Sequence, residues 1–327
     1  MSDDASAEDQ LIARFFAPLA THPGALGLTD DAACIAPPPD CDLVLTTDAL
    51  IAGVHFFAED AAHTIACKAL RVNLSDLAAK GARPLGFLLS LALPKNIGEA
   101  WLANFAEGLR SDAVLYACPL FGGDTDRTPG PLNVSIAMLG SVPSGTMVRR
   151  AGTKTGDRVF VSGTIGDATL GLALRQGAGW TLTETQRQHL IARYLLPQPR
   201  MALAEAVRNF ASAAMDVSDG LAGDVAKLCR SSQVGATIEV ARVPLSDAAR
   251  AAIAADPALL ERALTGGDDY EIVCTVAADK VDDFRAAAEA AKVPVSDIGE
   301  IVSGAGARFL GSGGEAMNFT RASYSHF

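Results

Sequence analysis

The sequence lacks most of the short motifs that identify a nucleotide-binding or catalytic site. It contains no G-x-x-x-x-G-K-[ST], which excludes a P-loop, and no G-x-G-x-x-G after an expected strand, which leaves a dinucleotide-binding fold unsupported. The protein-kinase motifs and the G-x-S-x-G nucleophile elbow are absent as well. The histidines form no metal-binding pair; they are His22, His55, His63, His189 and His326. Any phosphate or metal chemistry must therefore rest on other residues.

Paired cysteines and long hydrophobic runs are also missing. The six cysteines show no C-x-x-C pair and no zinc spacing, and most lie in apolar runs, so we expect buried free thiols in a reducing cytoplasm. The segment Met1 to Gln10 is acidic and has no apolar core, which is not typical of a signal peptide. The longest apolar run, Leu85 to Pro94, is much shorter than the roughly 18 residues of a membrane span. We expect a cytoplasmic protein without a membrane partner.

Positive charge is scarce. The formal net charge is −11 and no run of Lys or Arg occurs, which argues against a nucleic-acid partner. An acidic chain that binds phosphate needs cations, and metal ions would supply them. The chain has 327 residues, of which 49% are hydrophobic, so it is long enough for two domains with cores of their own.

Strands and helices alternate in both halves of the sequence, which predicts a mixed α/β fold with two domains. A segment rich in Pro and Gly, residues 143–156, separates the halves, and we place the domains at 1–145 and 146–327. In the first half we expect strands at 43–47, 85–93, 119–121 and 133–142 and helices at 11–19, 64–80 and 99–117. In the second half we expect strands at 158–162, 237–240, 270–276 and 297–302 and helices at 167–175, 218–230, 245–254 and 279–291.

Aspartates recur at the ends of apolar runs or beside glycines. Asp48 follows Leu43 to Thr47, Asp124 follows Gly122-Gly123, and Asp216 and Asp219 flank a Val-Ser pair. The other members of the set are Asp30, Asp31 and Asp76. Two bare carboxylates about 4 Å apart repel by roughly 4 kcal/mol at an effective dielectric constant of about 20. Each acid alone could be a solvated turn residue, but the set together predicts bound Mg²⁺ and metal-dependent phosphate chemistry.

One of these acids, Asp76, and the serine beside Asp219 have expected local surroundings. Asn73, Asp76 and Lys80 are spaced to share a polar stripe of the helix at 64–80. Ser218 is expected to cap the following helix, a role compatible with phosphate binding because helix N-termini attract anions.

Several motifs together resemble those of thiamine-monophosphate kinases. The motifs are Asp30-Asp31-Ala32-Ala33, Thr46-Thr47-Asp48-Ala49-Leu50, Gly53-Val54-His55-Phe56, Lys68 to Pro84, Gly122-Gly123-Asp124-Thr125, Met215 to Leu221, Gly266 to Glu271 and the final His326-Phe327. They cover nearly the whole chain in the family's order. The resemblance implies an ATP-dependent enzyme that phosphorylates thiamine phosphate to thiamine diphosphate.

The resemblance also implies the architecture and the chemistry. The fold is that of the aminoimidazole-ribonucleotide-synthetase superfamily, in which the N-terminal sheets of two subunits pair into a homodimer and a C-terminal α/β domain completes the site. ATP is the co-substrate and several Mg²⁺ ions are the cofactors. No residue is expected to act as general base, because the attacking group is a phosphate oxygen that is already ionised at neutral pH.

Site residues follow from the motif positions. Mg²⁺ is expected on Asp31, Thr46, Thr47, Asp48, Asp76, Asp124, Asp216 and Asp219. ATP is expected on Gly123, Asp124, Arg150, Ser218 and Tyr116, with Arg149 as the alternative to Arg150. Thiamine phosphate is expected on His55, Asp268 and Tyr324. The sequence departs from the family's pattern at Thr29, where Gly is usual, at Asp268, where Glu is usual, and at Asp126 and the turn Thr128-Pro129-Gly130.

Three other functions are alternatives to this one. A synthetase of the same superfamily is an alternative, although selenophosphate synthetase would need a reactive Cys near a Gly-rich N-terminal arm. A hydrogenase-maturation relative would present a C-terminal cysteine, whereas this chain ends in Ser325-His326-Phe327. An inactive ATP-binding scaffold is disfavoured because the whole set of acids is present.

Overall fold

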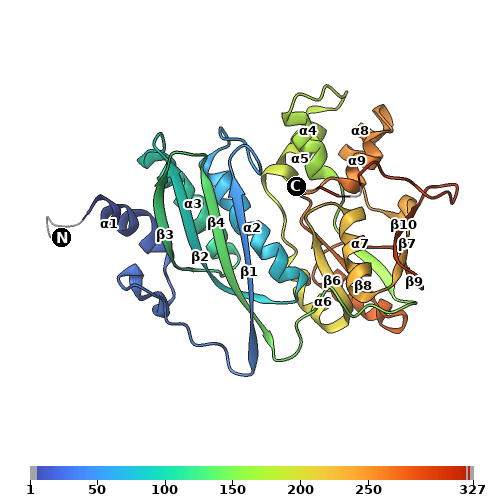
Figure 1. Cartoon of the computed structure of the whole chain (residues 1–327), viewed down its shortest axis with the longest axis horizontal. Helices are drawn as coiled ribbons and strands as arrows, with labels where there is room; N and C mark the ends of the chain where they lie inside the picture. Colours follow the sequence, from blue (N-terminus) through green and yellow to red (C-terminus); the bar gives the residue numbers. More distant parts are fainter. Residues whose placement is uncertain (1–5, 322, 325–327) are drawn as a thin grey trace. The chain divides into compact units, whose positions relative to one another are not determined.

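The computed structural model describes residues 6–321 and 323–324, and its chain divides into two compact units (Figure 1). The first unit is Met1–Leu77 with Arg83–Gly145, and the second is Ala78–Ala82 with Thr146–Phe327. His326 and Phe327, which contribute to the sequence resemblance, lie outside the described residues. None of the described helices is both long enough and apolar enough to cross a membrane.

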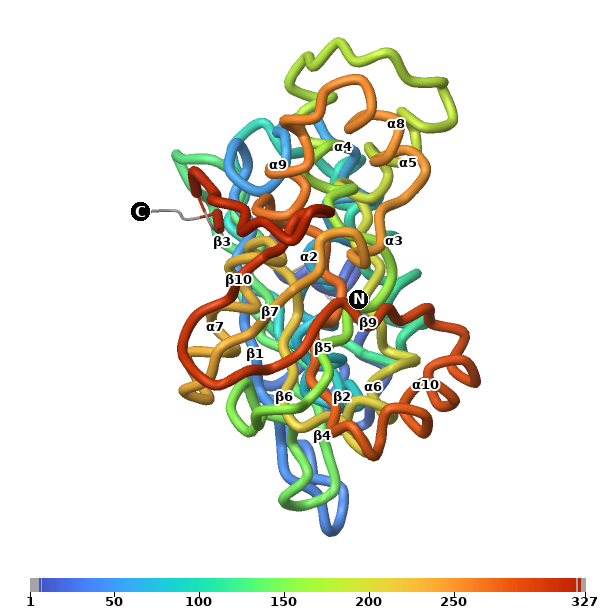
Figure 2. Tube along the Cα trace, turned by 90° about the vertical axis from the view of Figure 1, so that its right-hand side faces the viewer, coloured from blue at the N-terminus to red at the C-terminus, as the bar shows by residue number. Residues whose placement is uncertain are grey.

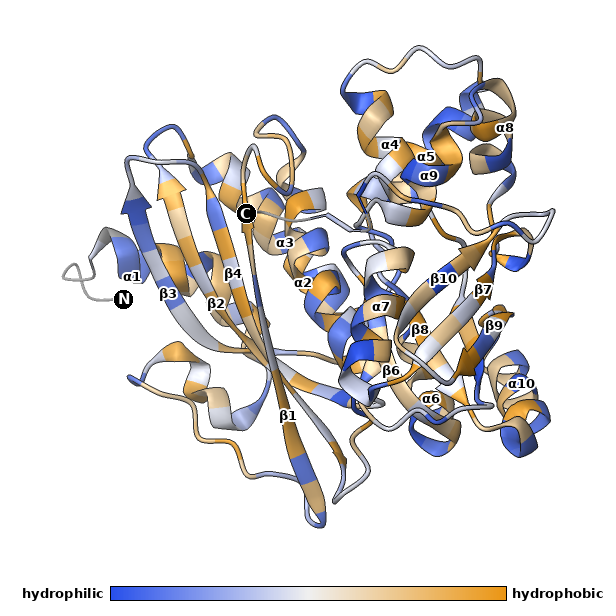
Figure 3. Ribbon diagram, turned by 45° about the vertical axis from the view of Figure 1, so that its right-hand side comes forward, coloured by the Kyte–Doolittle hydropathy of each residue, from blue (hydrophilic) through white to orange (hydrophobic). Residues whose placement is uncertain are grey.

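The first unit is built on a four-stranded sheet in the order β1-β4-β2-β3. Its neighbours are antiparallel except β2 and β3, which are parallel. Hydrophobic residues occupy most of β2, as expected for a central strand (Figure 3). The strands are β1 (Cys41–Ile51), β2 (Arg83–Pro94), β3 (Leu120–Thr128) and β4 (Asn133–Pro143).

Two helices, α2 (Ala62–Ala79) and α3 (Glu99–Leu115), cover one face of this sheet (Figure 1). Small residues permit the close packing. A Cβ on Gly140 of β4 would lie 2.9 Å from the Leu77 side chain, and one on Gly108 of α3 would lie 2.4 Å from the His63 carbonyl oxygen. Burial alternates along β1, so Val44 and Leu50 face the helices while Leu43 and Leu45 lie on the other face.

The N-terminal segment differs from the single helix expected at 11–19. It contains α1 (Ala7–Leu11), a π-helical turn (Ile12–Phe16) and a 3-10 turn (Ala17–Leu19), with a further 3-10 stretch at Pro23–Leu28. Ser6 and Asp9 form a capping box at the start of α1, which explains why the helix begins earlier than expected. Pro18 has no N–H to donate to a preceding carbonyl, so a regular α-helix does not continue through it.

The second unit contains a six-stranded sheet in the order β10-β7-β9-β5-β8-β6. Every neighbouring pair is antiparallel except β10 and β7. The strands are β5 (Arg158–Ser162), β6 (Ala211–Val217), β7 (Gly235–Glu239), β8 (Glu271–Val276), β9 (Val295–Val302) and β10 (Gly306–Leu310).

Helices pack on this sheet and also form a cluster of their own. α6 (Ala204–Phe210) and α10 (Val281–Ala290) lie side by side over one hydrophobic core, and α7 (Leu221–Ser232) packs on another (Figure 2). A third core lies among α4 (Asp167–Arg175), α5 (Glu184–Leu195), α8 (Asp247–Ala255) and α9 (Leu259–Thr265). Short 3-10 turns occupy Met201–Leu203, Val240–Arg242 and Ala278–Lys280.

The mixed α/β architecture predicted from the sequence is confirmed. β5 and α4 have the bounds that the sequence predicts, whereas β6, β10, α5, α6 and α9 were not anticipated. β3 extends to Thr128 instead of ending at residue 121, because its pairing with β2 continues past the two glycines.

Candidate functional site

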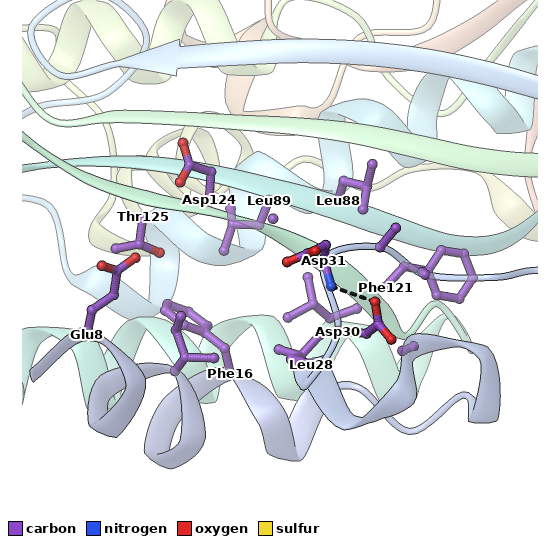
Figure 4. A pocket seen from close by; sticks show the side chains of 17 residues that line it. Glu8, Phe16, Leu28, Asp30, Asp31, Leu88, Leu89, Phe121, Asp124 and Thr125 are labelled. Carbon is purple, nitrogen blue, oxygen red and sulfur yellow. Dashed lines mark hydrogen bonds between the residues drawn. The ribbon is translucent and has the colours of Figure 1, made fainter. Parts of the chain in front are cut away.

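Acidic residues of the first unit line a pocket of about 290 Å³ (Figure 4). The pocket lies among α1, the loop after residue 28, and the strands β2 and β3. Its acids are Glu8, Asp30, Asp31 and Asp124. Its large apolar side chains include Phe16, Leu88, Leu89 and Phe121. Two predicted metal ligands, Asp31 and Asp124, and the predicted ATP contact Gly123 thus line one cavity.

The two acids at the start of this loop have different surroundings. The Asp30 carboxylate accepts a hydrogen bond from the Asp31 N–H at 2.8 Å, as the dashed line in Figure 4 marks. That bond fixes the loop, which agrees with the view of Asp30 as a turn acid. Both residues are exposed, and Asp31 is the one that remains a predicted ligand.

Gly123 is required by the sheet itself. A Cβ at this position would lie 1.8 Å from the Leu89 carbonyl oxygen of β2, whereas a Cβ on Gly122 would meet only a side-chain atom at 3.5 Å. The second glycine therefore allows β3 to pair closely with β2. That requirement explains Gly123 without a ligand, and it carries Asp124 to the strand position opposite Ser90.

A second acidic group forms where β1 passes α2. The Thr46 hydroxyl donates a hydrogen bond to the Asp76 carboxylate, and Asp48 lies two residues further along β1 on the same face. Thr46, Asp48 and Asp76 are all half-buried. Hydroxyl and carboxylate oxygens at one place are a donor set that suits Mg²⁺.

Strand alternation separates the predicted ligands Thr47 and Asp124 from this group. Thr47 lies on the opposite face from Thr46 and Asp48, and its hydroxyl donates to the Ile136 carbonyl oxygen at 3.0 Å. The sheet register places Asp124 on that same face, in the row of Ser90 and Ser135. Thus the predicted ligands of the first unit form two sets and not one.

Two residues expected on one polar stripe with Asp76 have polar partners of their own. Asn73 is fully buried, and its side chain donates to the Ala69 carbonyl oxygen at 3.0 Å. The Lys80 ammonium, expected on the same stripe, donates to the Ala214 carbonyl oxygen of β6 at 2.7 Å within the second unit.

His55 lies in a tight turn directly after β1. Its Nδ1 accepts the Ile51 N–H at 3.0 Å, and the buried Lys68 ammonium donates to its carbonyl oxygen at 2.9 Å. Because Nδ1 accepts, the neutral ring carries its proton on Nε2. His55 is therefore held in the tautomer that can donate to a phosphate oxygen.

Tyr116 ends α3, next to an ion pair between Arg71 and Asp112. The Tyr116 N–H donates to the Asp112 carbonyl oxygen at 2.9 Å, and Arg71 binds the Asp112 carboxylate through two nitrogens at 2.7 and 2.9 Å. Burial lowers the pKa of Arg71, but the hydrogen bond and the charge of Asp112 outweigh it and raise the pKa above its ordinary value.

In the second unit, three distant segments meet at the turn Val217–Gly220 that follows β6. The Asp268 N–H donates to the Ser218 carbonyl oxygen at 2.9 Å, and the Tyr324 N–H donates to the Asp219 carbonyl oxygen at 3.0 Å. The structure therefore brings together Ser218, Asp219, Asp268 and Tyr324, which the sequence predicted for ATP, metal and thiamine phosphate.

Glycines make this meeting possible. Gly220 has a φ of 109°, and a Cβ on it would lie 2.6 Å from the Thr265 backbone. A Cβ on Gly267 would lie 2.3 Å from the Ser218 carbonyl oxygen. Helix α7 begins after Gly220, and no side chain caps its first turn, so the expectation that Ser218 caps the helix is wrong.

A lysine binds one of the predicted metal ligands. The Lys227 ammonium on α7 donates to the Asp219 carboxylate and, at 2.8 Å, to the fully buried Asp224. Burial lowers the pKa of Lys227, but these two hydrogen bonds outweigh it and raise the pKa above its ordinary value. Lys227 and Asp224 were missed by sequence reasoning, although their spacing of three residues on one helix is a detectable signal.

The predicted residue Asp216 belongs to β6, and the predicted residue Arg150 follows a segment that runs beside this strand. Asp216 is buried in the strand, opposite Ile272 of β8. The segment before Arg150 runs beside β6, because the Arg149 carbonyl oxygen accepts the Ala214 N–H at 2.9 Å. Arg149 and Arg150 are both exposed, so the choice between them for phosphate stays open.

Behind the turn, the second unit buries several charged groups. Glu271 is fully buried and accepts hydrogen bonds from Arg193, Arg200 and the Ser162 hydroxyl, at distances from 2.5 to 2.8 Å. Asp269 is buried too and accepts the Gly166 N–H at 2.8 Å. Burial raises the pKa of Asp269 well above its ordinary value, although the N–H donors and Arg193 oppose the rise.

Within residues 6–321 and 323–324, no three His, Cys, Asp or Glu side chains lie together in a group able to hold a metal ion. The predicted donors are nevertheless hard oxygen ligands of the kind that Mg²⁺ takes, with Thr46 and Asp76 already in contact. The residues present therefore fit Mg²⁺ in their chemistry, and the ligand assignments remain predictions.

Comparison with known proteins assigns the family. Residues 29–142 match the family model "AIR synthase related protein, N-terminal domain", and residues 154–311 match the corresponding C-terminal domain. A thiamine-monophosphate kinase from Caulobacter vibrioides is 46% identical over 299 residues, which are 90% of this chain and 84% of that protein. The chain belongs to the thiamine-monophosphate kinase family. The resemblance predicted from the sequence motifs is thus confirmed, together with the prediction of an enzyme of the kinase class.

Solved structures of the family agree with the fold. The thiamine-monophosphate kinase from Stenotrophomonas maltophilia K279a matches with a TM-score of 0.84 and 38% identity, over 96% of this chain and 98% of that one. "AaThiL complexed with AMPPCP and TMP" matches with a TM-score of 0.78 and 30% identity, over 91% of each chain. The predicted two-domain fold of the aminoimidazole-ribonucleotide-synthetase type is therefore confirmed.

Proposed function

We propose that this chain transfers the γ-phosphoryl group of ATP to thiamine phosphate and releases thiamine diphosphate. The observation that carries the proposal is the whole-chain similarity to thiamine-monophosphate kinases, one of which is solved with AMPPCP and TMP. The acidic and hydroxyl residues that we propose bind Mg²⁺ and the substrates lie at β1, α2, β3 and the turn after β6.

Mg²⁺ would be held by Asp31, Thr46, Thr47, Asp48, Asp76 and Asp124, with Asp216 and Asp219 contributed by the second unit. When bound there, Mg²⁺ would neutralise charge on the phosphates and favour in-line displacement. The acceptor oxygen of thiamine phosphate is already ionised, so no side chain needs to take a proton. The residues of this chain bind the two substrates and orient their phosphates.

Individual residues have distinct tasks in this mechanism. His55, with its proton on Nε2, donates to the phosphate of thiamine phosphate. Arg150 contacts the ATP phosphates as a cation, with Ser218, Gly123 and Tyr116 as further ATP contacts. Asp268 accepts a hydrogen bond from, or balances the charge of, the thiamine ring system, and Tyr324 lies beside it at the same turn.

The deciding experiment incubates the purified protein with ATP labelled in the γ-phosphate, MgCl₂ and thiamine phosphate, and separates the products by chromatography. We expect labelled thiamine diphosphate, and no labelled product when thiamine phosphate is replaced by thiamine. ATP hydrolysis without any thiamine diphosphate would overturn the proposed reaction.

The number of metal ions has its own test. Activity should keep rising with Mg²⁺ after all the ATP is complexed, because the protein carboxylates bind ions beyond the nucleotide's own. Saturation at the point where ATP is fully complexed would contradict a site with several ions.

The proposal includes a cytoplasmic homodimer formed through the first unit. Its support is the face of the sheet opposite α2 and α3, where Leu43, Leu45 and Leu88 are 44%, 70% and 41% exposed. Exposed large hydrophobic side chains grouped on one sheet face are typical of an interface. Light scattering at micromolar concentration should give the mass of two chains, and a single chain would refute the dimer.

A further inference from the structure

The turn Gly266–Tyr270 has an unusual backbone at the residue that we propose meets thiamine phosphate. Asp268 has a φ of 74° and Tyr270 a φ of 50°, although neither is glycine. Residues other than glycine rarely adopt this left-handed backbone conformation. They keep it only where the surrounding structure holds them. Something must therefore fix this turn.

Asp269, which lies between these two residues, is bonded to a different element from its neighbours. The N–H groups of Asp268 and Tyr270 donate to the carbonyl oxygens of Ser218 and Val217, both at 2.9 Å. The side chain of Asp269 instead accepts the N–H of Gly166 at 2.8 Å and that of Ala168 at 3.4 Å, at the start of α4. The turn is thus held between the end of β6 and the first turn of α4.

The start of α4 cannot provide this cap itself. The N-cap residue is Gly166, with a φ of 87° and no side chain to bond the helix N–H groups. A Cβ there would lie 2.4 Å from the Ala263 Cβ, so the local Ser, Thr, Asp or Asn that usually caps a helix has no room. Asp269 supplies the missing acceptor from a residue 101 positions away from Ala168.

Neighbouring buried groups are already engaged elsewhere. Asp167 accepts hydrogen bonds from the hydroxyls of Thr164, at 2.6 Å, and Ser246, at 2.5 Å, and contacts His189 at 3.1 Å. Asp167 is as deeply buried as Asp269 and lies at the same helix start, but none of these bonds reaches the turn 266–270. It is therefore a matched control for burial and charge.

We propose that Asp269 is a positioning residue of the kinase site: its bonds to the N-terminus of α4 hold the left-handed backbone at Asp268 and so aim Asp268 at thiamine phosphate. The inference rests on the proposed function and adds a residue to that function's site. Asp269 acts only through Asp268 and touches neither substrate. An amide cannot replace it, because its NH₂ would face an N–H donor where the carboxylate offers a second acceptor.

The test compares Asp269→Asn with Asp167→Asn in steady-state assays at saturating ATP and at saturating thiamine phosphate. We expect Asp269→Asn to raise the KM for thiamine phosphate on the order of tenfold, because a small displacement of a positioning contact is costly. The KM for ATP should stay within about twofold. Asp167→Asn should lower the urea midpoint of unfolding without changing either KM.

A double variant separates positioning from general destabilisation. In an Asp268→Ala background, Asp269→Asn should add little to the KM for thiamine phosphate, since the residue through which it acts is gone. Equal effects of Asp269→Asn in both backgrounds, or an unchanged KM in the single variant, would overturn the proposal. If Asp269→Asn does not fold, Asp269→Ser, whose hydroxyl still accepts one N–H, must show the same selective rise in KM.

Amide hydrogen exchange provides a readout independent of activity. In Asp269→Asn, the protection of the Asp268 and Tyr270 amides should fall at least tenfold, while Asp167→Asn leaves it unchanged. If the wild-type protein makes no thiamine diphosphate, the proposed function is overturned, and with it the proposed contact between Asp268 and thiamine phosphate. Unchanged protection in Asp269→Asn overturns the positioning of the turn itself.

Discussion

The two units present their predicted site residues in contrasting ways. In the first unit, Asp31 and Asp124 are exposed around a pocket and are placed by the register of a sheet edge. In the second, the turn Val217–Gly220 is backed by charged side chains that are fully or almost fully buried, including Asp224, Asp269 and Glu271. The predicted residues at the pocket of the first unit are therefore solvated, whereas those at the turn of the second unit are backed by buried charge.

This difference separates chemistry from stability. An exposed carboxylate can change partner with little effect on folding, because water already satisfies it. A buried carboxylate with two arginines cannot, because removing one partner leaves uncompensated charge in the interior. Substitutions of exposed acids in the first unit should consequently affect turnover and leave the free energy of unfolding nearly unchanged. Substitutions of the buried charges behind the turn should lower the free energy of unfolding, and at Asp269 also raise the KM for thiamine phosphate.

The largest expected effect is on Glu271. Glu271→Gln leaves Arg193 and Arg200, which are 11% and 22% exposed, without their carboxylate. The free energy of unfolding should fall by about 3–5 kcal/mol, measured by urea denaturation. Glu239→Gln, which breaks the more exposed pair with Arg242, is the control and should cost less than about 1 kcal/mol. Similar losses in both variants would remove the contrast drawn between buried and exposed charge.

Next come Asp48, which is half-buried, and Asp124, which is exposed, in the first unit. Asp48→Asn or Asp124→Asn should lower turnover on the order of 10²–10³-fold, the scale for losing one preorganised electrostatic contact. Their urea midpoints should stay near that of the wild type. Asp126→Asn, on the same face of β3 and outside the predicted ligand set, is the control and should keep its activity. If Asp124→Asn is as active as the control, Asp124 is only a solvated strand residue.

A smaller and more selective effect is expected at Asp268. Asp268→Ala should raise the KM for thiamine phosphate about tenfold and leave that for ATP nearly unchanged, since it removes a contact to one substrate. Asp268→Glu should be tolerated, because the family usually carries Glu here. If Asp268→Ala instead raises the KM for ATP and leaves that for thiamine phosphate unchanged, Asp268 contacts the nucleotide and not thiamine phosphate.

The smallest effect concerns the thiols, and it tests burial in both units at once. Burial raises the pKa values of Cys67, Cys118 and Cys274 from 9.0 to about 12 and that of Cys229 to about 11. A rise from 9.0 to about 12 lowers the thiolate fraction at pH 8 about a thousandfold, and the smaller rise at Cys229 acts in the same direction. Iodoacetamide at pH 8, followed by mass spectrometry, should modify the exposed Cys34 and spare these four until urea is added. Rapid labelling of any of the four would show that its unit opens locally.

Sequence periodicity was sufficient for elements that combine a regular pattern with clear end signals. β5 is a short apolar strand and α4 starts with Asp and ends with Arg, so both had the predicted bounds. α5 was missed because its mean hydropathy is low and its only strong signal is the capping box of Thr183 and Gln186. The N-terminal helix failed at Pro18, where the amphipathic pattern continues but the hydrogen-bonding pattern cannot.

Site residues were predictable as types, but their neighbours were not. A local pattern indicated Asp219, and the family resemblance indicated Asp268. The contact of their turns, however, depends on backbone approaches at Gly220 and Gly267 that no spacing encodes. Asp268 and Asp269 are both aspartates in one motif, and only the fold shows that Asp269 bonds to the start of α4. Likewise, alternation along β1 separates Thr46 from Thr47, although both belong to one motif.

The helix α2 has a consequence for how the chain is made. Its last residues, Ala78 and Ala79, pack with Val148, Phe160 and other core residues of the second unit, although they are synthesised long before that unit. A protein cut at residue 145 would give a C-terminal fragment without this segment, and its core would have a gap. The N-terminal half emerging from a ribosome likewise carries an unpacked apolar helix end until most of the chain has been translated. We therefore expect the two halves, cut at residue 145, to be recovered in soluble form only when they are produced together.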